Sequence, residues 1–176
     1  MRDFEEYCWR DLVSDEVRYI YSPYVRERSV GPRPALLVVH PGQGIDGAWR
    51  NFAEELLAQA RQRKMEVIHS VVAGNSFLKI EEGEAVCARP CESAFFSTDL
   101  ERILTTRGAG SLIVCGGPTS GALRATAVEG KSFGYKVAIA EETVGDESAF
   151  LHKIALFDIA HKYADVMSLE ELREKL

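Results

Sequence analysis

Short apolar runs alternate with amphipathic stretches along most of the chain. The runs lie at 35–40 (ALLVVH), 66–72 (EVIHSVV), 84–89 (EAVCAR), 111–116 (SLIVCG), 136–141 (KVAIAE) and 164–168 (ADVMS). Their near-continuous content of Val, Ile and Leu is typical of parallel strands that are buried on both faces. We therefore predict a β-strand at each run.

Two of the intervening stretches carry clear helical signals. Residues 97–106 open with a Ser-Thr-Asp capping group. The stretch 48–63 carries one apolar stripe, made of Phe52, Leu56, Leu57 and Ala60. Strands that alternate with helices in this way predict an α/β fold, with a doubly wound parallel sheet covered by helices on both faces.

The first part of the chain does not follow this alternation. We predict an N-terminal arm at 1–33, with an initial helix that packs on the domain or on a neighbouring subunit, and one domain at 34–176. The length of 176 residues and the hydrophobic content of 46% fit a single core.

Charge and composition exclude several classes of partner. The formal charge of -6, from 27 acidic and 21 basic residues, disfavours nucleic acid. No apolar run reaches the roughly 18 residues that cross a bilayer, and the first residues are too acidic for an export signal. We expect a cytoplasmic protein with no membrane partner, whose four cysteines are reduced thiols.

The most specific segment follows the fourth predicted strand. Residues 116–118 form a Gly-Gly-Pro turn that leads into a helix near Ser120. Backbone N–H groups at a helix start can hold an anion or an oxyanion. The alternative is that the glycines only allow a tight strand-to-helix connection. His40, at the end of the first predicted strand, lies where α/β sheets bind ligands.

Five segments carry a resemblance to a known family. They are RPALLVVH, ARPCESAFFSTDLERIL, VCGGPTSGALRATAVEGKSFGYKVAI, VGDES and HKIALFDIAHKYADVMSLEEL. Together they resemble the isochorismatase-like cysteine hydrolases, most closely the N-carbamoylsarcosine and maleamate amidohydrolases. The resemblance implies a Rossmann-like three-layer fold with a six-stranded parallel sheet. It also implies amide hydrolysis through a thioester in a homo-oligomer, a dimer or tetramer.

The family's three catalytic residues can be followed to positions in this chain. His40 stands at the position of the aspartate base, Arg89 at that of the lysine and Ala122 at that of the cysteine nucleophile. A methyl group cannot attack a carbonyl, so we do not expect cysteine-dependent hydrolysis. Neither Cys91 nor Cys115 lies at the helix start that would activate a thiolate.

The replacements still suggest chemistry. His40 is a candidate acid or base, and the planar Arg89 suits a carboxylate. The alternatives are a buried, hydrogen-bonded His40 and an Arg89 paired with Glu92. The substrate-binding candidates are Pro118, Thr119, Gly121 and Ala122.

Two further expectations concern individual residues near the predicted site. The resemblance places an unusual cis peptide before Thr119, and we predict it at Gly117–Pro118. His69 could approach His40, but two histidines without a nearby carboxylate make a poor metal site. We predict no metal and no cofactor.

Three functions remain open. The first is a repurposed enzyme that acts on a small carboxylate or amide. The second is a catalytically silent subunit that forms a hetero-oligomer with an active paralogue. The third is a small-molecule binding protein.

Overall fold

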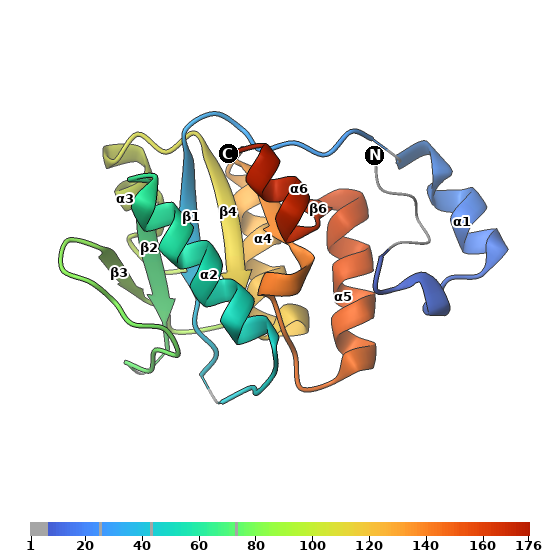
Figure 1. Cartoon of the computed structure of the whole chain (residues 1–176), viewed down its shortest axis with the longest axis horizontal. Helices are drawn as coiled ribbons and strands as arrows, with labels where there is room; N and C mark the ends of the chain where they lie inside the picture. Colours follow the sequence, from blue (N-terminus) through green and yellow to red (C-terminus); the bar gives the residue numbers. More distant parts are fainter. Residues whose placement is uncertain (1–6, 25, 43, 73) are drawn as a thin grey trace.

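Six parallel strands form one sheet in the computed structural model of the chain, which describes residues 7–24, 26–42, 44–72 and 74–176 (Figure 1). The strand order is β3-β2-β1-β4-β5-β6, and every pairing is parallel. The strands are β1 (Pro34–Val39), β2 (Glu66–Val71), β3 (Ala85–Ala88), β4 (Ser111–Gly116), β5 (Lys136–Ala140) and β6 (Asp165–Met167). The predicted fold class and all six predicted strands are confirmed.

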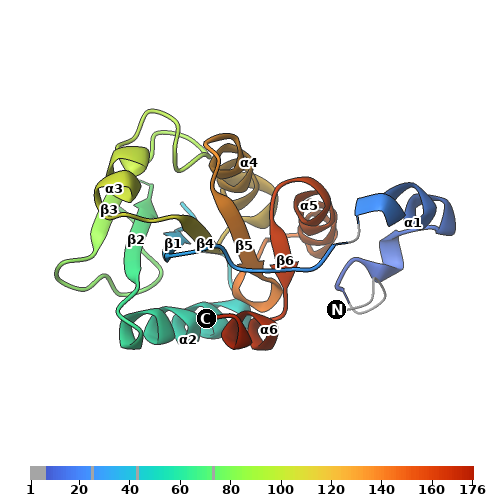
Figure 2. The ribbon, with the colours of Figure 1, turned by 90° about the horizontal axis from the view of Figure 1, so that it is seen from above.

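Helices cover both faces of the sheet (Figure 2). One layer contains α2 (Trp49–Gln62) and α6 (Leu169–Glu174); the other contains α3 (Leu100–Thr106), α4 (Arg124–Ser132) and α5 (Ala149–Lys162). The shorter elements are η2 (Arg10–Leu12), α1 (Asp15–Tyr21), η3 (Ser22–Tyr24), η4 (Thr119–Leu123) and η5 (Glu141–Thr143). Within the described ranges, no helix has the length and apolar character needed to cross a membrane.

The central strand β1 shows why the predicted runs are almost wholly apolar. Its side chains alternate between two apolar clusters, with Leu36 and Val38 in the cluster under α2 and α6. Leu37 and Val39 belong to the cluster under α3, α4 and α5. Both faces of the strand are therefore buried, as expected for a covered parallel sheet.

The predicted apolar stripe of α2 needs one correction. Phe52 is 39% exposed, whereas Ala53 is fully buried. The helix begins at Trp49, which is buried, and the helical spacing from this residue carries the buried face through Ala53, Leu56, Leu57 and Ala60.

The carboxyl ends of all strands meet at one edge of the sheet. The chain leaves β1 through α2 on one face, and leaves β3 through α3 on the other, so the crossover direction changes between β1 and β4. Such a switch point leaves a crevice at the strand ends, which is where open α/β sheets bind ligands.

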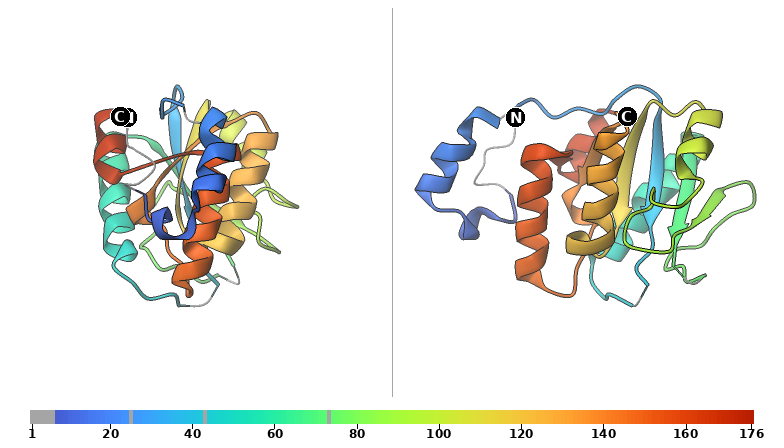
Figure 3. Two further views of the ribbon diagram at one scale, coloured as in Figure 1. Left: turned by 90° about the vertical axis from the view of Figure 1, so that its right-hand side faces the viewer. Right: turned by 180° about the vertical axis from the view of Figure 1, so that it is seen from behind.

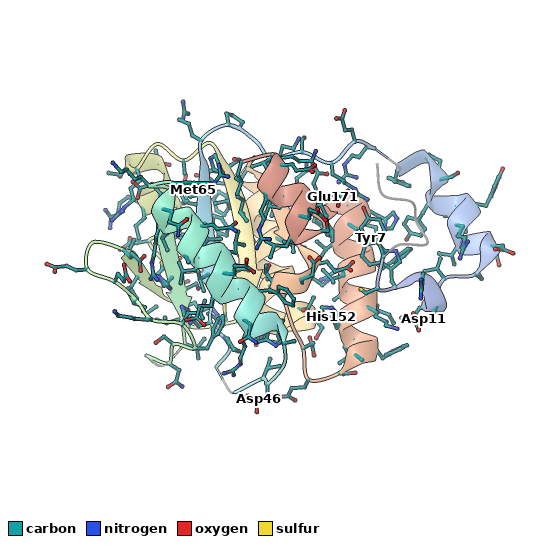
Figure 4. The ribbon with its side chains drawn as sticks, in the orientation of Figure 1. Tyr7, Asp11, Asp46, Met65, His152 and Glu171 are labelled. Carbon is teal, nitrogen blue, oxygen red and sulfur yellow. The ribbon has the colours of Figure 1, made fainter. Side chains whose placement is uncertain are left out.

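The arm lies against the domain at α5 and β6. Tyr7 and Trp9 are buried, and the Tyr7 hydroxyl donates a hydrogen bond to the carbonyl oxygen of Val166 (Figure 4). Helix α1 has no buried residue and stands away from the sheet, beyond α5 (Figure 3). Residues 1–6 of the predicted arm lie outside the described residues.

The Asp165 carboxylate, at the start of β6, holds the end of the arm. Its side chain is 6% exposed and pairs with Arg26 at 3.0 Å and with Lys136 at 3.5 Å. The backbone N–H of Ser29 also donates to it, at 3.2 Å. These contacts satisfy the oxygens of a buried carboxylate, which would be costly to leave unpaired.

A chain of hydrogen bonds between side chains ties the end of β1 to β2 and to the segment before β3. The Phe77 backbone N–H donates to His40 Nδ1 at 3.0 Å, and His40 Nε2 lies 2.8 Å from His69 Nδ1. His69 Nε2 lies 2.9 Å from the Glu84 carboxylate, which Arg61 also holds at 2.7 Å. Because an amide N–H can only donate, both imidazoles fit as neutral donors from Nε2.

These hydrogen bonds confirm that His69 approaches His40. The expectation that no carboxylate lies nearby is wrong, because Glu84 bonds to His69. All four ring nitrogens are occupied, so neither imidazole has a lone pair left for a metal ion. Burial lowers the pKa of His40 to about 3 and also lowers the pKa of His69. Burial works to raise the pKa of Glu84, but hydrogen bonds led by the one from Arg61 outweigh it and lower the value to about 2.

Replacing Asp165 by Asn should loosen the arm. Loss of the charge leaves Arg26 and Lys136 without their partner, and we expect a cost of about 2 kcal/mol, because hydrogen bonds to charged groups are worth about 1.5–3 kcal/mol. Thermal unfolding should then shift by about 4–8 °C. Limited proteolysis should cut the arm of the variant faster. The control is Asp99→Asn, which breaks an exposed pair with Arg102. Equal losses in both variants would contradict this role of Asp165.

Acid should destabilise the protein through His40. Unfolded, this histidine titrates near 6.5, whereas its folded pKa is about 3. The unfolded state therefore binds the extra proton, and stability is complete above pH 6.5 and falls as the pH drops towards 3. At pH 5 the loss from one such histidine is about 2 kcal/mol.

Urea unfolding at pH 7.5 and pH 5 measures this loss. His40→Gln does not titrate, so the variant, though less stable at pH 7.5, should lose about 2 kcal/mol less than the parent on acidification. An unchanged pH dependence in His40→Gln would show that the loss comes from other groups.

Candidate active site

A cavity of about 440 Å³ lies over the carboxyl ends of the strands. Its lining residues follow five of the six strands: Pro41, Gly42, Ile45, Val72, Arg89, Glu92, Pro118, Ser120, Asp146, Glu147 and Leu151. Figure 4 labels two neighbours at this end of the molecule, Asp46 on the loop after β1 and His152 near the start of α5. A larger cavity, of about 620 Å³, lies at the opposite edge between the arm and β5 and β6. Only the smaller cavity meets the switch point.

Arg89 lines this cavity and also joins two strand ends. Its Nη1 donates to the carbonyl oxygen of Ser70 at 2.8 Å, and its Nη2 donates to that of His40 at 2.6 Å. The residue is 5% exposed, and its Nε has no hydrogen-bond partner among the described residues. The ion pairs recorded for the described part of the chain do not include one between Arg89 and Glu92.

Acidic side chains form much of the remaining wall. Asp146 accepts two hydrogen bonds from Ser120, from the backbone N–H at 2.8 Å and from the hydroxyl at 2.7 Å. Burial works to raise the pKa of Asp146, but these bonds outweigh it and hold the pKa below its ordinary value. Glu92 lies beside Gly121, where its carboxylate would be 3.0 Å from an added Cβ. With Glu147, the cavity has three acidic residues and one guanidinium group.

The turn after β4 requires glycine at its first position. Gly116 has φ +113°, and a Cβ there would lie 2.0 Å from the carbonyl oxygen of Val39. The predicted cis peptide at Gly117–Pro118 is confirmed. The chain then enters the π-helical turn η4, in which Gly121 has non-helical angles of φ -106° and ψ -105°.

Ala122 is fully buried and belongs to the apolar cluster under α3, α4 and α5. Thr119 is also fully buried, and its hydroxyl lies 2.9 Å from Nδ1 of His152. The N–H of Gly121, one of the predicted substrate-binding residues, donates to the carbonyl oxygen of Pro118 at 3.2 Å. The described cavity lining thus includes Arg89 and Pro118 but not His40, Thr119, Gly121 or Ala122. Catalytic or binding roles for these residues stay predictions.

Neither Cys115 nor Cys91 lies among the described lining residues of the cavity. Burial raises the pKa of Cys115 to about 12, so this thiol carries almost no thiolate at neutral pH. Cys91 is exposed and is not among the described lining residues.

Three polar residues of the described cavity lining, Ser120, Asp146 and Glu147, were not identified as site residues from the sequence. Asp146 follows β5, so the strand-end argument that singled out His40 would also have indicated Asp146. Ser120 lies within the turn after β4, but the residues predicted there as substrate-binding were its neighbours Pro118, Thr119, Gly121 and Ala122. His152, near the start of α5, bonds to Thr119 at this edge.

Comparisons with known proteins agree with this architecture. Maleamate amidohydrolase of Pseudomonas putida is 34% identical over 120 residues, which cover 65% of this chain and 56% of that protein. N-carbamoylsarcosine amidase of an Arthrobacter species is 34% identical over 95 residues, 54% of this chain and 36% of that protein. The chain thus matches about half or less of the length of these curated relatives.

A solved structure shows the same fold, and a family model covers most of the chain. The crystal structure of an isochorismatase from Pseudomonas putida superposes with a TM-score of 0.73 at 22% identity, covering 88% of this chain and 97% of that one. The model of the isochorismatase domain matches residues 44–171. The chain therefore belongs to the isochorismatase family.

Proposed function

We propose that the chain is a cysteine-independent enzyme that binds and transforms a small amide in the cavity at the carboxyl edge of the sheet. The proposal rests on one observation: a buried guanidinium and three acidic residues line the same cavity. Nε of that guanidinium has no hydrogen-bond partner among the described residues. An amide matches this set, because its oxygen accepts from a guanidinium and its N–H groups donate to carboxylates.

The charges favour an amide over a simple carboxylate. A carboxylate ligand would be repelled by Glu92, Asp146 and Glu147, and Arg89 already gives two of its three nitrogens to strand carbonyls. By their names, the curated relatives act on maleamate and N-carbamoylsarcosine, each of which carries an amide-type group beside one carboxylate, so the repulsion counts most against ligands that have carboxylates alone. We therefore narrow the predicted ligand, a small carboxylate or amide, to the amide.

The proposed reaction does not use a cysteine nucleophile, for a geometric reason. The residue at the position that the resemblance assigns to the nucleophile is Ala122, whose methyl group is buried in the core. Cys115 is buried, and Cys91 lies outside the described lining. The reaction we propose thus uses groups of the cavity wall.

A binding protein without turnover is the second candidate function. It is favoured by the internal engagement of His40, whose two ring nitrogens are both hydrogen-bonded. In that case amides bind and no product forms. A catalytically silent subunit would bind no amide. The homo-oligomer and the hetero-oligomer with a paralogue are further proposals, which a measurement of the molecular mass in solution would test.

Glu92→Gln should weaken amide binding about tenfold, since a hydrogen bond to a charged group is worth about 1.5–3 kcal/mol and 1.4 kcal/mol is tenfold. Isothermal titration would compare maleamate with maleate, and N-carbamoylsarcosine with sarcosine. We expect each amide to bind more tightly than its partner without the amide. Glu101→Gln, on α3 outside the cavity, is the control. Tighter binding of maleate than of maleamate would refute the amide proposal.

Turnover should not depend on a thiol. We expect ammonia to be released from the bound amide at the same rate in the parent and in Cys91→Ala, and after treatment of the parent with iodoacetamide. A coupled ammonia assay gives the rate. Loss of turnover in Cys91→Ala, together with inactivation of the parent by iodoacetamide, would instead identify Cys91 as the nucleophile.

A further inference from the structure

We infer that Ser120 is the nucleophile of this cavity and that Asp146 accepts its proton. The inference rests on the proposed amide site and assigns its reacting groups. It places the nucleophile two residues before the position that the family resemblance assigns to it.

The first support is the geometry of the pair. Ser120 and Asp146 both line the cavity, and the serine hydroxyl donates to Asp146 Oδ2 at 2.7 Å. Asp146 is oriented in turn by the backbone N–H groups of Ser120 at 2.8 Å and Ser148 at 3.3 Å. A nucleophile bonded to its base, and a base held by further donors, are the two contacts that covalent catalysis requires.

The second support is the backbone between Ser120 and Ala122. Gly121 leaves helical geometry within the π-helical turn η4, and such turns often occur at functional sites. On one side of Gly121 the Ala122 side chain packs into the core, and on the other side Ser120 reaches the cavity. This turn therefore presents residue 120, rather than residue 122, to a ligand.

The third support is the position of Arg89, which lines the same cavity. A guanidinium beside the attacked carbonyl stabilises the negative charge that develops on its oxygen. The backbone N–H groups of Ser120 and Gly121 are already bonded to Asp146 and Pro118, so they do not supply this stabilisation.

The reaction proceeds through an ester. Ser120 Oγ attacks the amide carbon while its proton moves to Asp146, and the resulting oxyanion lies against Arg89. The C–N bond then breaks, and Asp146 passes the proton to the leaving nitrogen, which departs as ammonia or an amine. Water attacks the ester with Asp146 as proton acceptor. The acid leaves, and the proton returns to Ser120. The net change is amide plus water to acid plus amine.

A carboxylate is a weaker base than an imidazole, and the hydrogen bonds to Asp146 lower its pKa further. We therefore expect slow turnover, with acylation as the slow step.

Two serine-directed probes test the assignment on the full chain. One is a fluorophosphonate and the other, smaller, is p-nitrophenyl acetate. Each should modify the peptide that contains Ser120, as located by tandem mass spectrometry. Ser120→Ala and Asp146→Asn should lose at least about 90% of this modification. Ser132→Ala removes an exposed hydroxyl at the end of α4 and is the matched control, which should label like the parent.

Ser120→Ala should keep its fold, because the Ser120 N–H bond to Asp146 does not need the hydroxyl. A single cooperative thermal unfolding transition, lowered by no more than the loss of one hydrogen bond to a charged group, checks this point. The inference is overturned if neither probe modifies Ser120, or if Ser120→Ala labels like the parent. The amide titrations remain independent, since Ser120→Ala should still bind amides: binding without modification rejects the nucleophile and leaves the amide site standing.

Discussion

The two hydrogen bonds from Arg89 to the carbonyl oxygens of Ser70 and His40 decide much of what this protein can do. These carbonyls stand at the carboxyl ends of β2 and β1, in the interior, where an unpaired backbone oxygen is costly. The guanidinium satisfies both and so fixes the two strand ends relative to each other. The same bonds place Arg89 at the cavity wall, where only its Nε has no hydrogen-bond partner among the described residues. Structural and chemical roles therefore compete for one side chain.

The same competition applies at the other positions that the resemblance assigns to catalysis. His40 gives both ring nitrogens to a buried chain that reaches Glu84, and Ala122 fills part of an apolar cluster. Each of the three side chains is engaged inside the protein. Among the described lining residues, the polar groups still able to meet a ligand are Nε of Arg89, the three acidic side chains and the Ser120 hydroxyl, all of which follow β3, β4 or β5. Chemistry in this cavity thus depends on these loop residues rather than on His40 and Ala122.

Sequence patterns predict the sheet well and the site only in part. Most of the runs become strands that are buried on both faces, and such burial requires continuous apolar side chains, which are visible in the sequence. The exception is the edge strand β3, where Val86 and Ala88 are exposed. Alternation along β1 also places His40 on the face of Leu36 and Val38, but a period of two does not say which face borders the cavity. The contact of His69 with Glu84 joins β2 to a segment fifteen residues away. A long-range contact of this kind leaves no local signal.

Placing the nucleophile at residue 120, as proposed, rather than at residue 122 changes how negative charge would be stabilised during a reaction. A nucleophile at the start of a helix can use the free N–H groups of the first turn as an oxyanion site. In η4 the N–H groups of Ser120 and Gly121 are bonded to Asp146 and Pro118, so these two groups are not available to an oxyanion. Negative charge on a ligand must then face the opposite wall, where Arg89 lies. For an amide bound as proposed, we expect the oxygen to face Arg89 and the nitrogen to face Asp146 and Glu92.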